Sequence, residues 1–171
     1  MKDNSKIMVS VVMGSDSDAP VMAEAVKVLR EFGIPCERYL TSAHRAPERT
    51  AAFARQAAER GVRIIIAGAG AAAHLAGVIA SQTPLPVIGV PIDATPLGGM
   101  DALLSTVQMP GGIPVATMAI GKSGAKNAAL MAVRILALED RDLRDKLDAY
   151  MAKLARDVEK KQEDLTASET D

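Results

Sequence analysis

Short apolar runs alternate with alanine-rich stretches over the first two thirds of this chain, and no other feature limits its possible folds so strongly. The apolar runs lie at residues 7–13, 37–41, 62–67, 86–90 and 115–119. Stretches long enough for helices separate the first four. Runs that are apolar almost throughout, such as 62–67 and 87–90, are typical of parallel strands covered on both faces. The sequence therefore predicts an α/β fold with a central parallel sheet of about five strands.

The expected helices have recognisable starts. Asp18 precedes Ala19 and Pro20, and Pro47 precedes Glu48. Proline is tolerated in the first turn of a helix, and acidic side chains favour the positive end of the helix dipole. Helices are therefore expected to begin near residues 19 and 47 and to cover the faces of the sheet.

The last part of the chain, from about residue 124 to residue 165, is expected to be mostly helical. Apolar residues recur there at steps of three, four and seven and form one stripe: Leu136, Leu143, Leu147, Tyr150, Met151, Leu154 and Val158. A domain with five strands rarely needs so long a terminal helix to close its core. We therefore interpret part of the stripe as a subunit contact, with packing inside the chain as the alternative. The charged end from residue 159 is expected to fray.

The length of 171 residues, without a Ser/Gly linker, predicts one domain. We expect an N-terminal extension (1–6), one catalytic domain with a C-terminal oligomerisation helix (7–165) and a flexible tail (166–171). The 20 basic and 21 acidic residues nearly cancel, and the chain has only two Tyr, two Phe and no Trp. This composition offers little to grip or stack on nucleic acid, so nucleic acid is not an expected partner.

Cys36 is the one cysteine of the chain and cannot form an internal disulfide. We interpret it as a small buried apolar side chain in a reducing compartment, with a reactive thiol as the alternative. The first six residues are polar and lack the apolar core of a signal peptide, and no apolar run is long enough to span a bilayer. A cytoplasmic protein without a membrane contact or a metal site is expected.

Polar and small residues follow three of the predicted strands, at residues 14–18, 42–47 and 68–74. In an open parallel sheet, ligands bind beside the carboxyl ends of the strands, where the strand order reverses. The three loops are therefore expected to share one pocket.

The loop at residues 42–47 is the best candidate for chemistry. His44 is one of only two histidines, and imidazole is the side chain that gains and loses a proton near neutral pH. Ser42 and Arg45 beside it are natural donors to a phosphate or carboxylate. The alternative is a polar connection whose histidine merely faces solvent.

In the first loop, Gly14 suits a tight turn, and Ser15 at a helix start is the best candidate for a phosphate donor. Asp18 is compatible with two roles, as a helix cap or as an acceptor for sugar hydroxyls. Asp16 and Ser17 can equally stabilise the turn itself.

In the third loop, glycine and alanine allow a ligand to approach the backbone and predict a dry wall. The spacing of Gly68, Gly70 and Ala73, with Asp93 further on, also satisfies a loose dinucleotide fingerprint, so a Rossmann-type cofactor module is a rival interpretation. That fingerprint follows the third strand instead of the first. From its position, His74 is expected to fix the loop more than to catalyse.

Four segments occur in a fixed order: MGSDSD at 13–18, SAHRAP at 42–47, AGAGAAAHL at 67–75 and QMPGGIP at 108–114. With them, the chain resembles the N5-carboxyaminoimidazole ribonucleotide mutase family of purine biosynthesis over nearly all of residues 7–140. The resemblance implies a flavodoxin-like three-layer fold, a homo-octamer, and a reaction without metal, nucleotide or organic cofactor.

Proteins of that family move a carboxylate from the exocyclic nitrogen of the substrate to C4 of its imidazole ring. The resemblance implies that His44 is the acid and base of a decarboxylation and recarboxylation in a closed pocket. It implies substrate-binding roles for two groups. The phosphate and ribose would be held by Ser15, Ser42, Arg45 and Asp18, and the carboxylate by the backbone around Ala69, Gly70, His74 and Leu75.

Relatives in the same superfamily carboxylate aminoimidazole ribonucleotide directly with carbon dioxide, and this reaction is the alternative. Those relatives tend to have lysine at the position of Arg45 and no histidine that matches His74. Arg45 and His74 therefore favour the mutase. The segment 108–114 is expected to cover either its own pocket or that of a neighbouring subunit.

Overall fold

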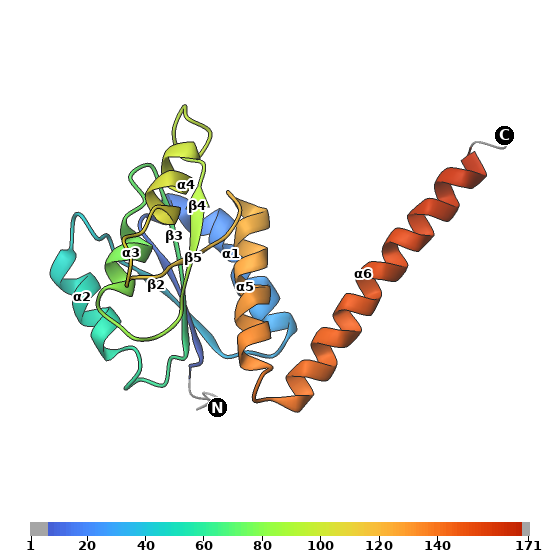
Figure 1. The fold of residues 1–171 in the computed structure, drawn as a ribbon, viewed down its shortest axis with the longest axis horizontal. Helices are drawn as coiled ribbons and strands as arrows, with labels where there is room; N and C mark the ends of the chain where they lie inside the picture. The colour runs from blue at the N-terminus through green and yellow to red at the C-terminus, as the bar shows by residue number, and fades with distance from the viewer. Residues whose placement is uncertain (1–6, 169–171) are drawn as a thin grey trace. The chain divides into compact units, whose positions relative to one another are not determined.

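A computed structural model describes residues 7–168 of the chain. Five parallel strands form one sheet in the order β2-β1-β3-β4-β5 (Figure 1). The strands are β1 (Val9–Met13), β2 (Cys36–Leu40), β3 (Ile64–Gly70), β4 (Val87–Ile92) and β5 (Ala116–Thr117). This order is that of the flavodoxin-like doubly wound fold. The predicted fold class is confirmed.

Helices connect the strands and continue beyond the last one. They are α1 (Ala19–Glu31), α2 (Pro47–Gln56), α3 (Leu75–Ala80), α4 (Met100–Val107), α5 (Lys122–Leu136) and α6 (Arg141–Ser168), with a short 3-10 helix η1 (Asp16–Asp18) before α1. The helices after β1 and β2 start at the predicted positions, with Pro20 in the first turn of α1 and Pro47 opening α2. The N-terminal extension predicted for residues 1–6 and the last three residues of the predicted tail lie outside the described residues.

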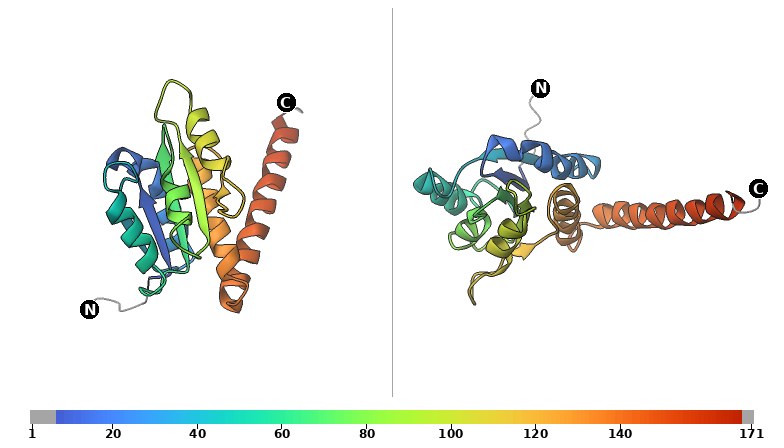
Figure 2. Two further views of the ribbon diagram at one scale, coloured as in Figure 1. Left: turned by 60° about the vertical axis from the view of Figure 1, so that its left-hand side comes forward. Right: turned by 90° about the horizontal axis from the view of Figure 1, so that it is seen from above.

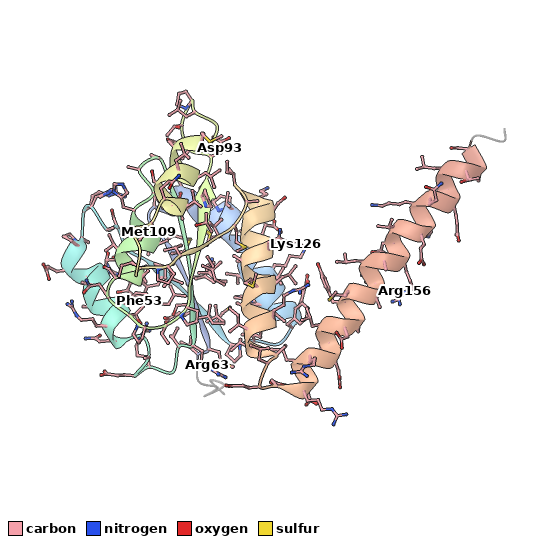
Figure 3. All side chains as sticks on the ribbon, viewed as in Figure 1. Phe53, Arg63, Asp93, Met109, Lys126 and Arg156 are labelled. Atoms are coloured by element: carbon pink, nitrogen blue, oxygen red, sulfur yellow. The ribbon has the colours of Figure 1, made fainter. Side chains whose placement is uncertain are left out.

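Helices cover both faces of the sheet and complete three layers (Figure 2). On one face, α2 and α3 pack on the central strands in a cluster that contains Phe53 and Ile79 together with Val12 and Ile65. Figure 3 shows Phe53 directed from α2 toward the sheet. On the other face lie α1 and the first part of α5 (Figure 2). The three inner strands β1, β3 and β4 are thereby buried, as the apolar runs predict, whereas the edge strands β2 and β5 are partly exposed.

β3 is longer than predicted, and this changes where the third loop begins. The expected strand ended at residue 67, but Gly68, Ala69 and Gly70 continue the ladder and pair with Val90, Pro91 and Ile92 of β4. The loop proper therefore starts at residue 71. Small residues are needed in this continuation because Met22 of α1 lies against Gly68, and Ala94, after β4, lies against Gly70.

The chain divides into two compact units, residues 1–132 and residues 133–171, and the second is mainly helical. The interpretation of residues 7–165 as a single domain stays a prediction. Within the second unit, Asp140 separates two helices, because its carboxylate accepts a hydrogen bond from the Leu143 N–H at 2.9 Å and caps α6. The Arg144 guanidinium donates to the carbonyl of Ala137 at 3.2 Å, near the end of α5.

The expected fraying from residue 159 is wrong for the described residues, because α6 continues to Ser168. Its charged last turns consist largely of good helix formers. Of the apolar stripe, Leu143 and Leu147 are buried, whereas Met151, Leu154 and Val158 are exposed. No helix within residues 7–168 combines the length and apolar character that crossing a membrane requires.

Candidate active site

A cleft of about 460 Å³ opens at the carboxyl ends of β1, β2, β3 and β4. β1 lies between β2 and β3, so the cleft occupies the point where the strand order reverses, as predicted. Eight of the nine residues assigned from the sequence line it: Ser15, Asp18, Ser42, His44, Arg45, Ala69, Gly70 and Leu75. The three predicted loops therefore do share one cavity.

The ninth residue, His74, reaches the site through its side chain. The His44 Nε2 and His74 Nδ1 atoms are 2.9 Å apart, at hydrogen-bonding distance. One of these nitrogens must donate and the other accept, so the tautomer of one ring sets the tautomer of the other. Sequence reasoning placed only the backbone of His74 near the ligand. The two histidines are 30 positions apart, and this separation hides the contact from sequence patterns.

The loop that carries His44 is fixed at its base. The buried hydroxyls of Thr41 and Thr50 are hydrogen-bonded at 2.9 Å, which ties the end of β2 to α2. Within the loop, the Ser42 hydroxyl accepts from the Arg45 N–H at 3.2 Å. The Arg45 guanidinium donates to the Gly14 carbonyl at 3.2 Å, so it connects the loops after β1 and β2. Serine and arginine thus face one region of the cleft.

Ser15 and Asp18 form a reciprocal capping box around η1. The Ser15 hydroxyl accepts from the Ser17 N–H, and the Asp18 carboxylate accepts from the Ser15 N–H at 2.9 Å. Asp18 makes no side-chain cap of α1, so its expected role as cap of that helix is wrong. The residue as a whole is 4% exposed, and this burial raises the pKa of its carboxyl group, while hydrogen bonds from the Ser15 and Gly14 backbone oppose the rise.

Glycine occurs in the site for reasons that differ from those predicted from the sequence. Gly14 has an ordinary φ, and an added Cβ would meet no atom closer than 3.6 Å, so a tight turn does not require glycine there. A Cβ on Gly68 would collide with the thioether of Met22 on α1. A Cβ on Gly70 would lie 2.5 Å from Cβ of Ala94. Both glycines are needed for packing of β3, and Gly70 also lines the cleft.

The rival dinucleotide fingerprint is not formed. Gly68 and Gly70 lie inside β3 instead of in a phosphate-binding turn, and Gly68 faces α1. The following helix, α3, has only six residues. The spacing therefore matches the fingerprint in sequence without its geometry.

Two lining residues carry features that the sequence did not reveal. Ala94, after β4, adds a fourth loop to the cleft. Its position at the carboxyl end of a strand was the available signal. Ala71 has φ of 53°, in the left-handed region that non-glycine residues rarely adopt. Backbone strain is thus placed directly at the cleft wall.

The cleft of the single chain is open to solvent, since His44, Arg45 and His74 are exposed. The closed pocket implied by the resemblance is not formed by this chain alone. None of residues 108–114 lines the cleft. Met109 lies against α3 beside Gly77, and residues 112–114 lie next to residues 80–85. This segment therefore does not cover its own site.

The site offers no clustered metal ligands. Within residues 7–168, no three His, Cys, Asp or Glu side chains are grouped so that they could hold a metal ion. The polar groups that converge on the cleft are hydroxyls, a guanidinium, a buried carboxylate and two imidazoles. Such a set can bind an anionic, hydroxylated ligand and move a proton.

Comparisons with known proteins agree with this arrangement. The family described as AIR carboxylase matches residues 8–157. A protein of Pyrococcus horikoshii named N5-carboxyaminoimidazole ribonucleotide mutase is 57% identical over 158 residues, which are 92% of this chain and 88% of that one. A protein of Synechocystis with the same name is 55% identical over 158 residues, covering 92% and 89%. A crystal structure of PurE from Treponema denticola superposes with a TM-score of 0.80 at 29% identity, over 90% of this chain and 94% of that one.

The model match covers most of the chain, and the two relatives exceed half identity over nearly its full length. The chain belongs to the AIR carboxylase family.

Proposed function

We propose that this chain isomerises N5-carboxyaminoimidazole ribonucleotide to 4-carboxy-5-aminoimidazole ribonucleotide, a step of de novo purine biosynthesis. The observation that carries the proposal is the contact of His44 and His74 at the edge of a cleft that also holds Ser42 and Arg45. The names of the relatives from Pyrococcus horikoshii and Synechocystis support the same reaction.

Substrate binding follows from the chemistry of the cleft. The hydroxyls of Ser15 and Ser42 and the guanidinium of Arg45 are suited to the phosphate, because all three can donate to its oxygens. The carboxylate of Asp18 is suited to accept from the ribose hydroxyls. The small wall formed by Ala69 and Gly70 allows the carboxylated ring to lie against the backbone of β3.

In the first step, protonated His44 acts as general acid toward the carbamate nitrogen. Proton transfer to that nitrogen allows the carbon–nitrogen bond to break, which releases carbon dioxide and leaves aminoimidazole ribonucleotide with a neutral exocyclic amine. His44 ends this step neutral. Held beside C4, the released carbon dioxide reacts at a high effective concentration.

In the second step, C4 forms a bond to carbon dioxide and temporarily carries both a proton and the new carboxylate. Neutral His44 removes the C4 proton, so the ring regains its aromaticity and the imidazole regains its starting charge. The contact with His74 sets which nitrogen of His44 carries a proton at each stage. His74 is therefore a positioning residue in this proposal.

The proposal includes a homo-octamer and a cytoplasmic location. The exposed apolar residues Met151, Leu154 and Val158 on α6 are available for contacts between copies. The cleft is open in one chain, so its closure is assigned to the substrate and to a neighbouring copy. The lone thiol of Cys36 needs no oxidising compartment.

The experiment that tests the function supplies N5-carboxyaminoimidazole ribonucleotide and follows formation of its C4 isomer. Wild type is compared with His44→Asn. Loss of the general acid and base should lower turnover by roughly 10²–10⁴-fold. Near-normal turnover by the variant would remove His44 from the mechanism.

A parallel assay with aminoimidazole ribonucleotide and dissolved carbon dioxide tests the direct carboxylase. The mutase predicts rapid conversion of the carbamate and only slow product formation from these two compounds at low carbon dioxide concentration. The opposite ranking would assign the chain to direct carboxylation. Analytical ultracentrifugation of the purified protein tests the octamer.

A further inference from the structure

A second cleft adjoins the first on the side of α2. It has a volume of about 400 Å³, and four of its lining residues also line the main cleft: Gly14, Ser15, Ser42 and Arg45. The two cavities are therefore continuous where the proposed phosphate donors lie. The outer cleft adds one cation that the main cleft lacks, Arg49 in the first turn of α2.

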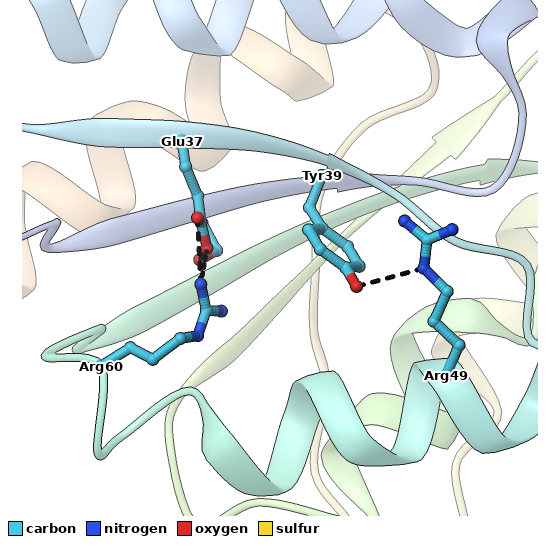
Figure 4. Close-up of polar contacts among 5 residues, drawn as sticks. Glu37, Tyr39, Arg49 and Arg60 are labelled. Carbon is cyan, nitrogen blue, oxygen red and sulfur yellow. Dashed lines mark hydrogen bonds and ion pairs between the residues drawn. The ribbon is translucent and has the colours of Figure 1, made fainter.

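The guanidinium of Arg49 is held in place by an aromatic side chain (Figure 4). Its Nε–H donates to the Tyr39 hydroxyl at 3.2 Å, and its central carbon lies 5.1 Å from the centroid of the same ring. The Tyr39 ring in turn stacks on buried Phe53, with centroids 4.3 Å apart and an interplanar angle of 23°. An exposed arginine is thereby fixed to the core, which lowers the entropy it loses on binding a ligand.

The charge of Arg49 is not compensated by a carboxylate in the part of the chain that the structure describes. Its hydrogen bond to Tyr39 uses Nε, and the two terminal nitrogens point away from Tyr39 (Figure 4). Arg60, at the other end of the same surface, is the contrasting case. It also lies over an aromatic ring, that of Phe53, but its Nη1 pairs with Glu37 at 2.9 Å. Arg49 therefore has a free charge and a free pair of donors, whereas Arg60 is neutralised.

Building on the function proposed above, we infer that the phosphate group of the substrate occupies the outer cleft and that Arg49 is its second cation, opposite Arg45. A phosphate monoester carries a charge close to −2 at neutral pH, more than one guanidinium offsets. The carboxylate of Asp16 lines the same cleft and adds a negative charge nearby. Arg45 and Arg49 together match the charge of the phosphate, and the carboxylate of Asp16 makes a single guanidinium still less sufficient. Tyr39 is the positioning residue for that guanidinium.

Arg49 is expected to contribute to binding of the phosphate and not to the proton transfers at His44. Arg49 is absent from the lining of the cleft that holds His44. Its loss should weaken capture of the phosphate without slowing proton transfer. KM should rise while kcat stays the same, and kcat/KM should depend less steeply on salt concentration, because a charge that attracts the substrate has been removed.

The test compares Arg49→Gln, Arg49→Lys and Tyr39→Phe with the matched control Arg60→Gln. We expect KM to rise about three- to tenfold in Arg49→Gln, the range of one exposed charge-assisted contact, and about twofold in Tyr39→Phe. Arg49→Lys, which keeps the charge, should recover part of the loss. Arg60→Gln should match the wild type. Melting temperatures establish that the variants are folded.

Three kinetic outcomes would overturn the inference. They are an unchanged KM in Arg49→Gln, an equal effect of Arg60→Gln, and a fall in kcat instead of a rise in KM. A lysine variant as weak as the glutamine variant would also overturn it, because the charge would then play no part.

Binding of inorganic phosphate, followed by the melting temperature, tests the role of Arg49 independently of the proposed reaction. Phosphate should raise the melting temperature of the wild type and of Arg60→Gln by mass action, and raise that of Arg49→Gln less. If this pattern holds while the carbamate substrate is not converted, the reaction is wrong and the anion site stands. If conversion is normal but Arg49→Gln responds to phosphate as the wild type does, the reaction stands and the role of Arg49 falls.

Discussion

The Nε2 atom of His44 lies 2.9 Å from the Nδ1 atom of His74, and the two rings meet edge to face at 83°. A hydrogen bond across this distance couples the tautomers of the two side chains, although they come from different loops. The proposed reaction first donates a proton to one ligand atom and then removes a proton from another. For such a reaction, the contact fixes which nitrogen of His44 faces the ligand as donor or acceptor.

We expect His74→Ala to lower kcat by about 10- to 100-fold, less than removal of His44, because the tautomer of His44 is then no longer set. His74→Asn should retain more activity, since its amide can take the place of Nδ1 as a hydrogen-bond partner. Steady-state kinetics across pH measures both values and the shape of the profile. Alanine and asparagine variants with the wild-type kcat and pH profile would show that His74 only shapes the loop.

Asp18→Asn should leave the protein as stable as the wild type at pH 7, or stabilise it by about 1 kcal/mol, the usual size of a favourable substitution. Burial raises the pKa of Asp18 above its ordinary value of 3.8, so the folded protein binds this proton more tightly than the unfolded chain. The contribution of Asp18 is therefore complete at acid pH below 3.8 and is lost as pH rises through the folded value. Urea unfolding at pH 7 and at about pH 4 measures the difference, which should shrink at the lower pH.

The same Asp18→Asn variant should bind the substrate more weakly, because an amide accepts fewer hydrogen bonds from ribose hydroxyls than a carboxylate. A rise in KM with a retained fold is the expected result. Asp16→Asn, on an exposed neighbour, provides the control for stability. An Asp18 variant that is clearly less stable at pH 7 would show that its hydrogen bond to Ser15 outweighs its burial.

Gly70→Ala should destabilise the protein by about 1–3 kcal/mol, the usual cost of overpacking. Its new Cβ would lie 2.5 Å from Cβ of Ala94 and 3.1 Å from the Ile92 carbonyl, so β4 would have to move at the cleft. Gly14→Ala is the matched control, since its Cβ would make only ordinary contacts from 3.6 Å outward. Urea unfolding of the two variants should rank them in this order, and an equal effect would contradict the packing account of Gly70.

Cys36 should react slowly with iodoacetamide at pH 7.5 in the folded protein. Burial raises the pKa of this thiol, and the nearby guanidiniums of Arg30 and Arg38 only partly oppose the rise. Mass spectrometry of the alkylated protein follows the rate, with the urea-unfolded chain as reference. A folded rate equal to the unfolded one would favour the reactive thiol.

The parallel sheet could be predicted because its inner strands β1, β3 and β4 are buried on both faces, and the cleft because parallel strands end at one edge. The sequence predicts too short a third strand, because Gly68 and Gly70 near the end of β3 are residues typical of a loop. Only the packing of Met22 and Ala94 against them explains why glycine occurs inside a strand. Cys36 is half-buried instead of fully buried, because it opens a strand at the edge of the sheet.

The polar residues of the site were predictable one loop at a time, but their mutual contacts were not. The His44–His74 contact and the support of Arg49 by Tyr39 depend on side-chain directions across different elements. The sequence predicts that the segment at 108–114 covers a cleft. In the structure this segment follows α4 and lies beside residues 80–85, at the end of α3 away from the cleft. Asp140 divides the C-terminal helical segment by capping α6. The regular spacing of apolar residues across this position gave no sign of the break.

The ladder between β3 and β4 continues to Gly70 and Ile92, so the wall of the cleft is part of the sheet itself. A wall anchored by backbone hydrogen bonds cannot fold over a ligand as a lid does. In the proposed reaction, it is the stationary surface against which released carbon dioxide is retained. Any motion that admits substrate or releases product must therefore come from the loops that face this wall.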